Sequence, residues 1–174
     1  KPDGTFVLRG KEGVEIEFDQ DGKMMLRRDR NLLETVYQWA GDNLISVTDP
    51  VGLVTTLNYS GDHVSSIVDP AGRMTQFTYA GGNLTAIIDP DGAKSTYRYE
   101  NGTFKHLITS LTLPRGNDPA ETSGLTFNEK IEYSKEGRVI GGTRVDGKKF
   151  TMTPAQLINV ADPLKAKDPA TPGK

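Results

Sequence analysis

The sequence contains no cysteine, which excludes disulfide bonds and thiolate metal sites. It also lacks any run of about 18 apolar residues, the length that a membrane-spanning helix needs. Neither sign of charge is in large excess, since 21 Lys and Arg face 23 Asp and Glu, so no general attraction to nucleic acid or anionic lipid is expected. The chain starts at Lys1 without a signal-peptide pattern, which predicts a fragment or a processed product.

Hydrophobic residues are scarce as well, at 35% of 174 residues, whereas 19 Gly and 10 Pro supply many break points. This composition suits many short strands separated by turns better than long helices. The length is enough for one domain with a core, or for part of something larger.

What the sequence does contain is a repeat. The phrase Asp-Pro-x-Gly begins at Asp49, Asp69 and Asp89, at intervals of twenty residues. Asp at the first position can accept backbone N–H groups, Pro is locked near the required φ, and Gly is the favoured exit, so each phrase predicts a type I turn. Halfway between these turns lies a second Gly-containing loop, at residues 41–44, 61–64 and 81–84. An aromatic residue precedes each of these loops, and the series continues once more: Trp39, Tyr59, Tyr79 and Tyr99.

Between the turns, residues alternate as in half-buried strands. One face of the predicted strands carries Leu57, Tyr59, Phe77, Tyr79, Tyr97 and Tyr99, and the other carries Thr56, Asn58, Gln76, Thr78, Thr96 and Arg98. Val47, Ile67 and Ile87 recur in the partner strands. We therefore predict an all-β fold with one antiparallel hairpin per twenty residues. Stacked in register, the hairpins would give each unit a neighbour that completes its core.

The regular repeats span about residues 39–100, inside a β domain predicted over residues 1–160 with irregular units at both ends. Residues 117–124 (NDPAETSG) are interpreted as an inserted loop. Thr153-Pro154 followed by Ala155 to Ile158 predicts one short helix near the C-terminus. The Pro-, Ala-, Lys- and Asp-rich segment 161–174 is predicted to be a flexible linker or tail.

These motifs resemble the RHS/YD-repeat family. The likeness is carried by Trp39-Ala40-Gly41-Asp42-Asn43-Leu44 through Asp49-Pro50-Val51-Gly52 and by the two copies that follow. Gly4 to Lys23 is also similar to the segment that leads into the repeats of bacterial Rhs proteins. Residues 3–117 match the pattern well and residues 125–150 loosely.

The resemblance implies part of a large bacterial protein that is secreted or displayed at the cell surface. In that family many hairpins form a long curved sheet that spirals into a hollow shell. The shell encloses a toxic C-terminal domain or supports a surface assembly, as in Tc toxin components and the teneurins. This sequence has too few repeats to close a shell, and it has no recognisable toxin domain. We therefore predict a structural scaffold without catalysis, with the remainder of the parent chain or its toxin domain as partner.

Candidate chemical sites have plainer structural explanations. Asp49, Asp69 and Asp89 could present a row of carboxylates to calcium, but each also caps its own turn, and a calcium site needs about six converging oxygens. Asp49-Pro50-Val51-Gly52-Leu53 also resembles the self-cleavage region of Rhs cores, yet no nucleophile or base is paired with it, and we interpret it as a turn.

The two histidines give no catalytic motif. His63 occupies a loop position that is Asn43 and Asn83 in the sister repeats, which is typical of a turn former. Neither His63 nor His106 has a Ser, Cys or carboxylate partner marked by a motif. We predict no catalytic, cofactor-binding or metal-binding residues.

A basic cluster near Lys23 contains Arg27, Arg28 and Arg30, but Asp29 interrupts it. Residues 42–100 carry seven acids against three bases. This distribution argues against a nucleic-acid groove.

The alternative to a scaffold is a surface module that binds carbohydrate or protein. Trp39, Tyr59, Tyr79 and Tyr99, stacked at one register, could form a platform for sugars. Because they share the phase of Leu57, Phe77 and Tyr97, the plainer interpretation is a packed aromatic ladder. In addition, a sheet cut from a longer array exposes unpaired strand edges, so we expect self-association through edges or exchange of terminal units.

Overall fold

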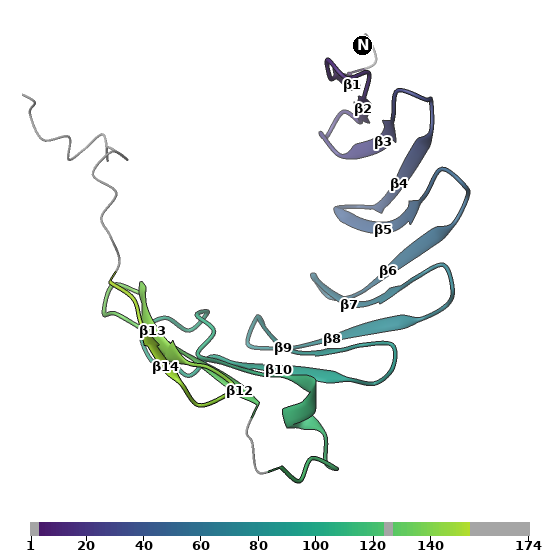
Figure 1. Ribbon diagram of the computed structural model, residues 1–174. Coiled ribbons are helices and arrows are strands. Elements are labelled where there is room, and N and C mark those ends of the chain that lie inside the picture. The colour runs from purple at the N-terminus through teal and green to yellow at the C-terminus, as the bar shows by residue number, and fades with distance from the viewer. Residues whose placement is uncertain (1–3, 124–126, 154–174) are drawn as a thin grey trace, which may run out of the picture.

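The structure is a computed structural model that describes residues 4–123 and 127–153. These residues form one 14-stranded antiparallel sheet in which each strand pairs with its neighbours in sequence. The strands are β1 (Phe6–Arg9), β2 (Glu15–Phe18), β3 (Met24–Arg28), β4 (Glu34–Ala40), β5 (Asn43–Thr48), β6 (Val54–Ser60), β7 (His63–Val68), β8 (Met74–Ala80), β9 (Asn83–Ile88), β10 (Lys94–Arg98), β11 (Ser110–Thr112), β12 (Asn128–Tyr133), β13 (Val139–Thr143) and β14 (Lys149–Thr151). Figure 1 shows that the sheet bends into an open arc with β1 and β14 at opposite ends. The predicted all-β fold is confirmed.

Helical structure within the described residues is limited to η1, a 3-10 turn at Pro114–Asn117. The helix predicted to start at Thr153-Pro154 lies outside the described residues, except for Thr153 itself, and so does the tail predicted over 161–174. The described part of the predicted insertion, residues 117–123, carries no strand and follows directly from η1.

The Asp-Pro-x-Gly phrases form the hairpin turns at one side of the arc. In the first, the Gly52 N–H donates to the Asp49 carbonyl at 3.0 Å. One carboxylate oxygen of Asp49 accepts the N–H groups of both Val51 and Leu53 at 2.9 Å, so the side chain holds the turn from inside. Gly52 has φ +87°, a left-handed conformation that Gly adopts without steric cost. This is the arrangement of a three-residue hairpin loop, and it explains why Gly stands at that position.

The same backbone turn forms in the other two phrases and also at five places where the phrase is absent from the sequence. In each copy the N–H of the fourth residue donates to the carbonyl of the first; the copies span residues 10–13, 19–22, 29–32, 69–72, 89–92, 134–137 and 144–147. The fourth residue is Gly with positive φ in all of them except one, where Leu32 takes φ +64°. This turn therefore occurs throughout the sheet and not only in the regular repeats.

Apolar residues gather on one face, as predicted, but neighbouring units are staggered. Leu57 lies opposite Ile67, and Ile67 lies opposite Thr75 on the next strand. Phe77, which occupies the place of Leu57 one repeat later, therefore lies two residues further along its strand. This offset recurs in the next unit, where Phe77 lies opposite Ile87 and Ile87 opposite Ser95. Units thus share a face while each is displaced along the strand direction from the one before.

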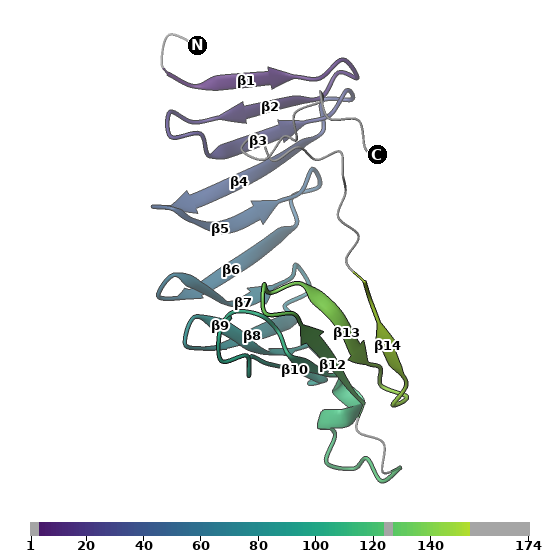
Figure 2. The same ribbon diagram turned by 90° about the vertical axis from the view of Figure 1, so that its left-hand side faces the viewer.

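A β-bulge accompanies each regular repeat. The register between β6 and β7 shifts at Asn58/Tyr59, so that Ser65 is the extra residue, and Ile45 and Thr85 are its equivalents one repeat away. A bulge bends its strand and increases the local twist. Because the bulge returns every twenty residues, we attribute the bending of the sheet, visible in Figures 1 and 2, to its repetition.

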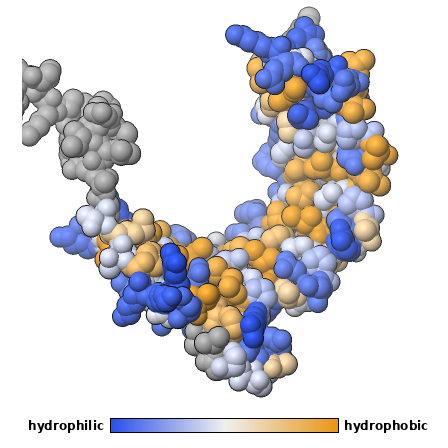
Figure 3. Space-filling model, viewed as in Figure 1, coloured by the Kyte–Doolittle hydropathy of each residue, from blue (hydrophilic) through white to orange (hydrophobic). Residues whose placement is uncertain are grey.

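The sheet is a single layer, and its apolar face is only half-buried. Among the described residues Ala86 is the one buried hydrophobic residue, while the buried polar residues are Ser46, Ser66 and Ser110. Leu57, Phe77 and Tyr97, expected in a core, are of intermediate exposure. Figure 3 shows hydrophobic residues at the surface along the arc, interleaved with hydrophilic ones. Adjacent units cover one another in part, and residues 4–123 and 127–153 form no second layer over this face.

Candidate functional site

The aromatic series is the most regular feature of the apolar face. The indole N–H or the hydroxyl of most of its members donates a hydrogen bond to a backbone carbonyl of the sheet. The Trp39 indole N–H donates to the Met24 carbonyl at 2.9 Å, and the Tyr59 hydroxyl donates to the Leu44 carbonyl at 2.9 Å. The equivalent bonds from Tyr99 to Leu84 and from Tyr133 to Ile108 measure 2.9 and 2.7 Å. Each bond ties a strand to the preceding hairpin. Burial raises the pKa of the Tyr99 and Tyr133 hydroxyls above the ordinary tyrosine value.

Tyr79 is the exception in this series. It is 36% exposed, and its ring lies 4.6 Å from the His63 imidazole, centroid to centroid, at an interplanar angle of 48°. No hydrogen bond of its hydroxyl is found among the described residues. His63 distinguishes this part of the sheet from the other repeats, which have Asn43 and Asn83 at the same position. The sequence marked His63 as unusual but did not show that its ring would contact Tyr79.

His106 lies at the next hairpin tip and has a structural partner. Its Nδ1 lies 2.6 Å from Oδ1 of Asn83, whose amide donates to the Lys105 carbonyl at 2.8 Å. Since the Asn83 oxygen can only accept, His106 Nδ1 is the donor of this bond. The loop that carries His106 also packs the Phe104 ring against Gly137, where an added Cβ would lie 3.2 Å from that ring. His63 thus contacts a tyrosine ring, and His106 contacts an amide oxygen.

The row of Asp carboxylates does not converge. Successive turn Asp residues on this side are two strands apart, which is about 9.6 Å at the usual strand spacing. The Asp69 carboxylate is further engaged by Arg73 at 2.6 Å, and this hydrogen bond lowers the pKa of Asp69. Within residues 4–123 and 127–153, no group of three His, Asp or Glu side chains could hold a metal ion. The turn-capping explanation accounts for Asp49 and Asp69, whereas the oxygen that accepts the Ala93 N–H belongs to Asp91.

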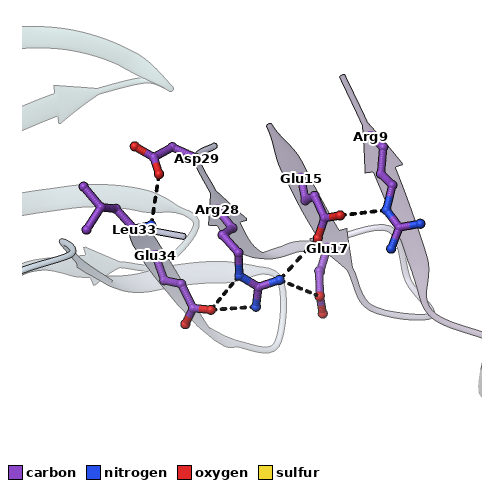
Figure 4. Close-up of polar contacts among 7 residues, drawn as sticks. All are labelled: Arg9, Glu15, Glu17, Arg28, Asp29, Leu33 and Glu34. Atoms are coloured by element: carbon purple, nitrogen blue, oxygen red, sulfur yellow. Dashed lines mark hydrogen bonds and ion pairs between the residues drawn. The ribbon is translucent and has the colours of Figure 1, made fainter. Parts of the chain in front are cut away.

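Arg28, a member of the basic cluster, is paired with acidic residues on both neighbouring strands. Figure 4 shows Arg28 between Glu34 on one neighbouring strand and Glu15 and Glu17 on the other. Its guanidinium lies 2.6 Å from Glu34 and 3.3 Å from Glu15, and the hydrogen bond to Glu34 is the main reason that the pKa of Arg28 is raised. Arg9 completes the row with a bond of 2.7 Å to Glu15. Cross-strand pairs of this kind stabilise a sheet, and here they offset the charge of Arg28.

One open cleft lies beside η1. It has a volume of about 730 Å³ and separates the turn at Asp91 and Gly92 from the segment 114–122. Asn117 fixes this segment, because its amide donates to the Lys94 carbonyl at 2.9 Å and its Oδ1 accepts from the Thr96 hydroxyl at 3.2 Å. The cleft is open and combines Lys94 and Arg115 with acidic residues, without a nucleophile–base pair. The hydrogen bonds of Asn117 therefore hold the segment after η1 against β10.

The comparisons with known proteins agree with the repeat geometry. A family model described as the RHS repeat matches residues 59–94 and, in a second overlapping match, residues 80–118. Together the matches run from the end of β6 to η1, a segment that includes Tyr79 and His106. A search of the curated proteins finds no match. Within the described residues, no helix has the length and apolar character needed to cross a membrane.

Proposed function

We propose, on the premise that residues 59–118 match the RHS-repeat family, that the chain forms part of the wall of a β shell that encloses a toxic domain or supports a surface assembly. The coarser statement, that the chain is a structural repeat module, follows from the family and the fold. The remainder of a longer parent chain, or its toxin domain, is the proposed partner. The proposed location is outside the cell or at its surface, by family resemblance.

One observation carries this proposal: a single-layered arc with a half-buried apolar face along its length. A module that functioned alone would be expected to bury that face in a closed core. Here Leu57, Phe77 and their neighbours keep part of their surface available. A wall built from such units would gain its stability from each adjacent unit and would keep an apolar surface for what lies against it.

The test begins with the gene that encodes this sequence. More repeats and a distinct C-terminal domain in its reading frame are expected. In that full polypeptide, the C-terminal domain should resist a protease as long as the wall is intact. Phe77→Glu, which places a charge on the apolar face, should make it cleavable, whereas Thr78→Glu on the polar face should not. A C-terminal domain cleaved at the same rate in all three proteins would contradict the proposal.

A second candidate, a surface that binds carbohydrate, is favoured only at Tyr79. This ring is exposed and its hydroxyl is not used by the sheet, unlike that of Tyr59. Aromatic faces stack on apolar faces of other molecules, and a free hydroxyl adds polar specificity. If the candidate is right, the unaltered chain binds glycans on an array. Tyr79→Ala abolishes this binding, and Tyr59→Phe keeps it. Absence of glycan binding by the unaltered chain would remove the candidate.

A further inference from the structure

The loop between β10 and β11 contains Asn101 followed by Gly102. Every other Asn of the chain is followed by a residue that has a side chain. The side-chain amide of an Asn can be attacked by the backbone nitrogen of the next residue, which closes a small ring. Gly favours this reaction because it puts no Cβ in the way and its backbone rotates freely. Asn101 is therefore the position of the chain where this reaction meets the least steric hindrance.

The loop holds the Asn101 amide in a polarised state. Its Oδ1 accepts the backbone N–H groups of Thr103 at 3.0 Å and of Phe104 at 2.9 Å. Both donors follow Gly102 in the chain, so the side chain is folded over the Gly102 peptide. When a nucleophile attacks Cγ, negative charge develops on Oδ1, and two backbone N–H groups at this distance are the arrangement that stabilises such an oxyanion. Within residues 4–123 and 127–153, no other Asn side-chain oxygen accepts two backbone N–H groups.

The nucleophile would be the Gly102 nitrogen, and the fold leaves it accessible. Its N–H donates no hydrogen bond among the described residues. Gly102 is exposed, so water and hydroxide reach this peptide. A Cβ added there would meet nothing within 4 Å, so the backbone has room to move toward the side chain. By contrast, Asn43, Asn58 and Asn83 lie within strands, where pairing holds the backbone.

We propose that Asn101 is a site of self-modification, at which the Gly102 nitrogen displaces ammonia from the side-chain amide. The nitrogen gives up its proton to a base from solvent and forms a bond to Cγ, while Oδ1 takes the negative charge. When that charge returns to the carbonyl, the Cγ–Nδ2 bond breaks, and Nδ2 takes up a proton from solvent and leaves as ammonia. The product is a cyclic succinimide that joins residues 101 and 102. Water then adds to one of its two carbonyls and opens the ring.

The two ways of opening the ring have different effects on the loop. Water that adds at Cγ gives aspartate, whose carboxylate accepts the same two N–H groups more strongly than an amide does. Water that adds at the main-chain carbonyl gives isoaspartate, in which the backbone runs through Cγ and the loop is lengthened. This loop is tied to β9, because the Asn83 amide donates to the Lys105 carbonyl at 2.8 Å. Either product adds a negative charge beside the exposed Lys105 and His106.

Peptide mapping by mass spectrometry tests this proposal on the full 174-residue chain, kept in mildly alkaline buffer. The peptide that contains Asn101 should gain the mass that corresponds to replacing NH₂ by OH, and an isoaspartyl methyltransferase should label part of it. Asn31 is also exposed but precedes Leu32, so it serves as the internal control and should stay unchanged. The matched variant is Gly102→Ala, whose added Cβ meets no neighbour, and the mass gain at residue 101 should be largely lost.

A second comparison separates the effect of the loop from that of the dipeptide. The N–H groups of Thr103 and Phe104 stabilise the oxyanion only in the folded loop, so the native chain should react several times faster than the same chain unfolded in urea. Far-ultraviolet circular dichroism checks that the native chain and Gly102→Ala stay folded during the incubation.

Three results would overturn the proposal: no mass gain at Asn101 in the native chain, a native chain that reacts no faster than the unfolded one, or an unchanged rate in Gly102→Ala. This inference does not depend on the shell function. A chain that keeps Asn101 intact would leave the protease-protection result untouched.

Discussion

Among single residues, Leu32 is the one most at odds with its backbone. It occupies a turn held by Asp29, whose carboxylate accepts the N–H groups of Asn31 at 2.7 Å and Leu33 at 3.0 Å. The other copies of this turn have Gly at the same position, whereas Leu32 takes φ +64° and is 75% exposed. A left-handed conformation costs an L-residue roughly 1–2 kcal/mol. The exposed side chain offsets little of this cost.

Leu32→Gly should therefore raise the free energy of unfolding by roughly 0.5–1 kcal/mol, after the larger backbone entropy of unfolded Gly is subtracted. Urea denaturation measures this change. The matched control is Leu33→Gly, because Leu33 is also exposed but has no positive φ, and it should lower stability. Equal effects of the two changes would show that φ at residue 32 carries no strain.

Glu121 should make the stability of the η1 segment depend on pH. Hydrogen bonds from the Ser123 side chain and backbone, with a further one from Arg115 at 2.5 Å, lower the pKa of the Glu121 carboxyl to about 2. A carboxyl whose folded pKa is depressed adds stability above its unfolded pKa, near 4.5, and that stability is lost as pH falls toward 2. The protection factors of amides in the η1 segment, which correct for the intrinsic pH dependence of hydrogen exchange, should fall as pH falls through this window. In Glu121→Gln this fall should be absent, and protection factors of the unaltered chain that do not change with pH would contradict the assignment.

At the scale of the element, β13 needs glycine because a side chain there would clash with its neighbouring strands, and not because of a positive φ. A Cβ on Gly142 would lie 2.2 Å from the Lys130 carbonyl oxygen and 2.9 Å from the Phe150 ring. Gly142→Ala should destabilise the β12–β14 unit by about 1–3 kcal/mol, the usual cost of overpacking. The control is Gly102→Ala, where an added Cβ meets nothing within 4 Å and φ is not positive. Thermal unfolding of both variants checks this, and equal melting temperatures would show that β13 can move aside.

The elements differ in how far sequence could predict them. Turns such as Asp49 to Gly52 were predictable, because carboxylate, Pro and Gly each act within four residues. Bulges at Ile45, Ser65 and Thr85 were not, because an extra residue is defined only by pairing with another strand. The turn at Asp29 was only partly predictable, since Leu32 gives no signal of positive φ. The contact between Tyr79 and His63 escaped prediction too, because it forms between two strands.

At the scale of the whole molecule, the period of twenty predicted that like residues share a face, and Leu57 and Phe77 do so. It did not predict the two-residue stagger between them, which depends on how strands pair and where each bulge lies. Nor did it predict that the apolar face stays half-buried, because period alone does not tell how many layers a sheet has. The central claim is therefore geometric: the repeats form one open, staggered layer.

Small-angle X-ray scattering at low protein concentration tests that claim most directly. A compact chain of this length would have a radius of gyration of about 16 Å. The open arc predicts a clearly larger value and an asymmetric distance distribution, both for the whole chain and for a version without residues 154–174. A value near 16 Å for that shorter version would mean that the sheet folds back upon itself, and would contradict the account.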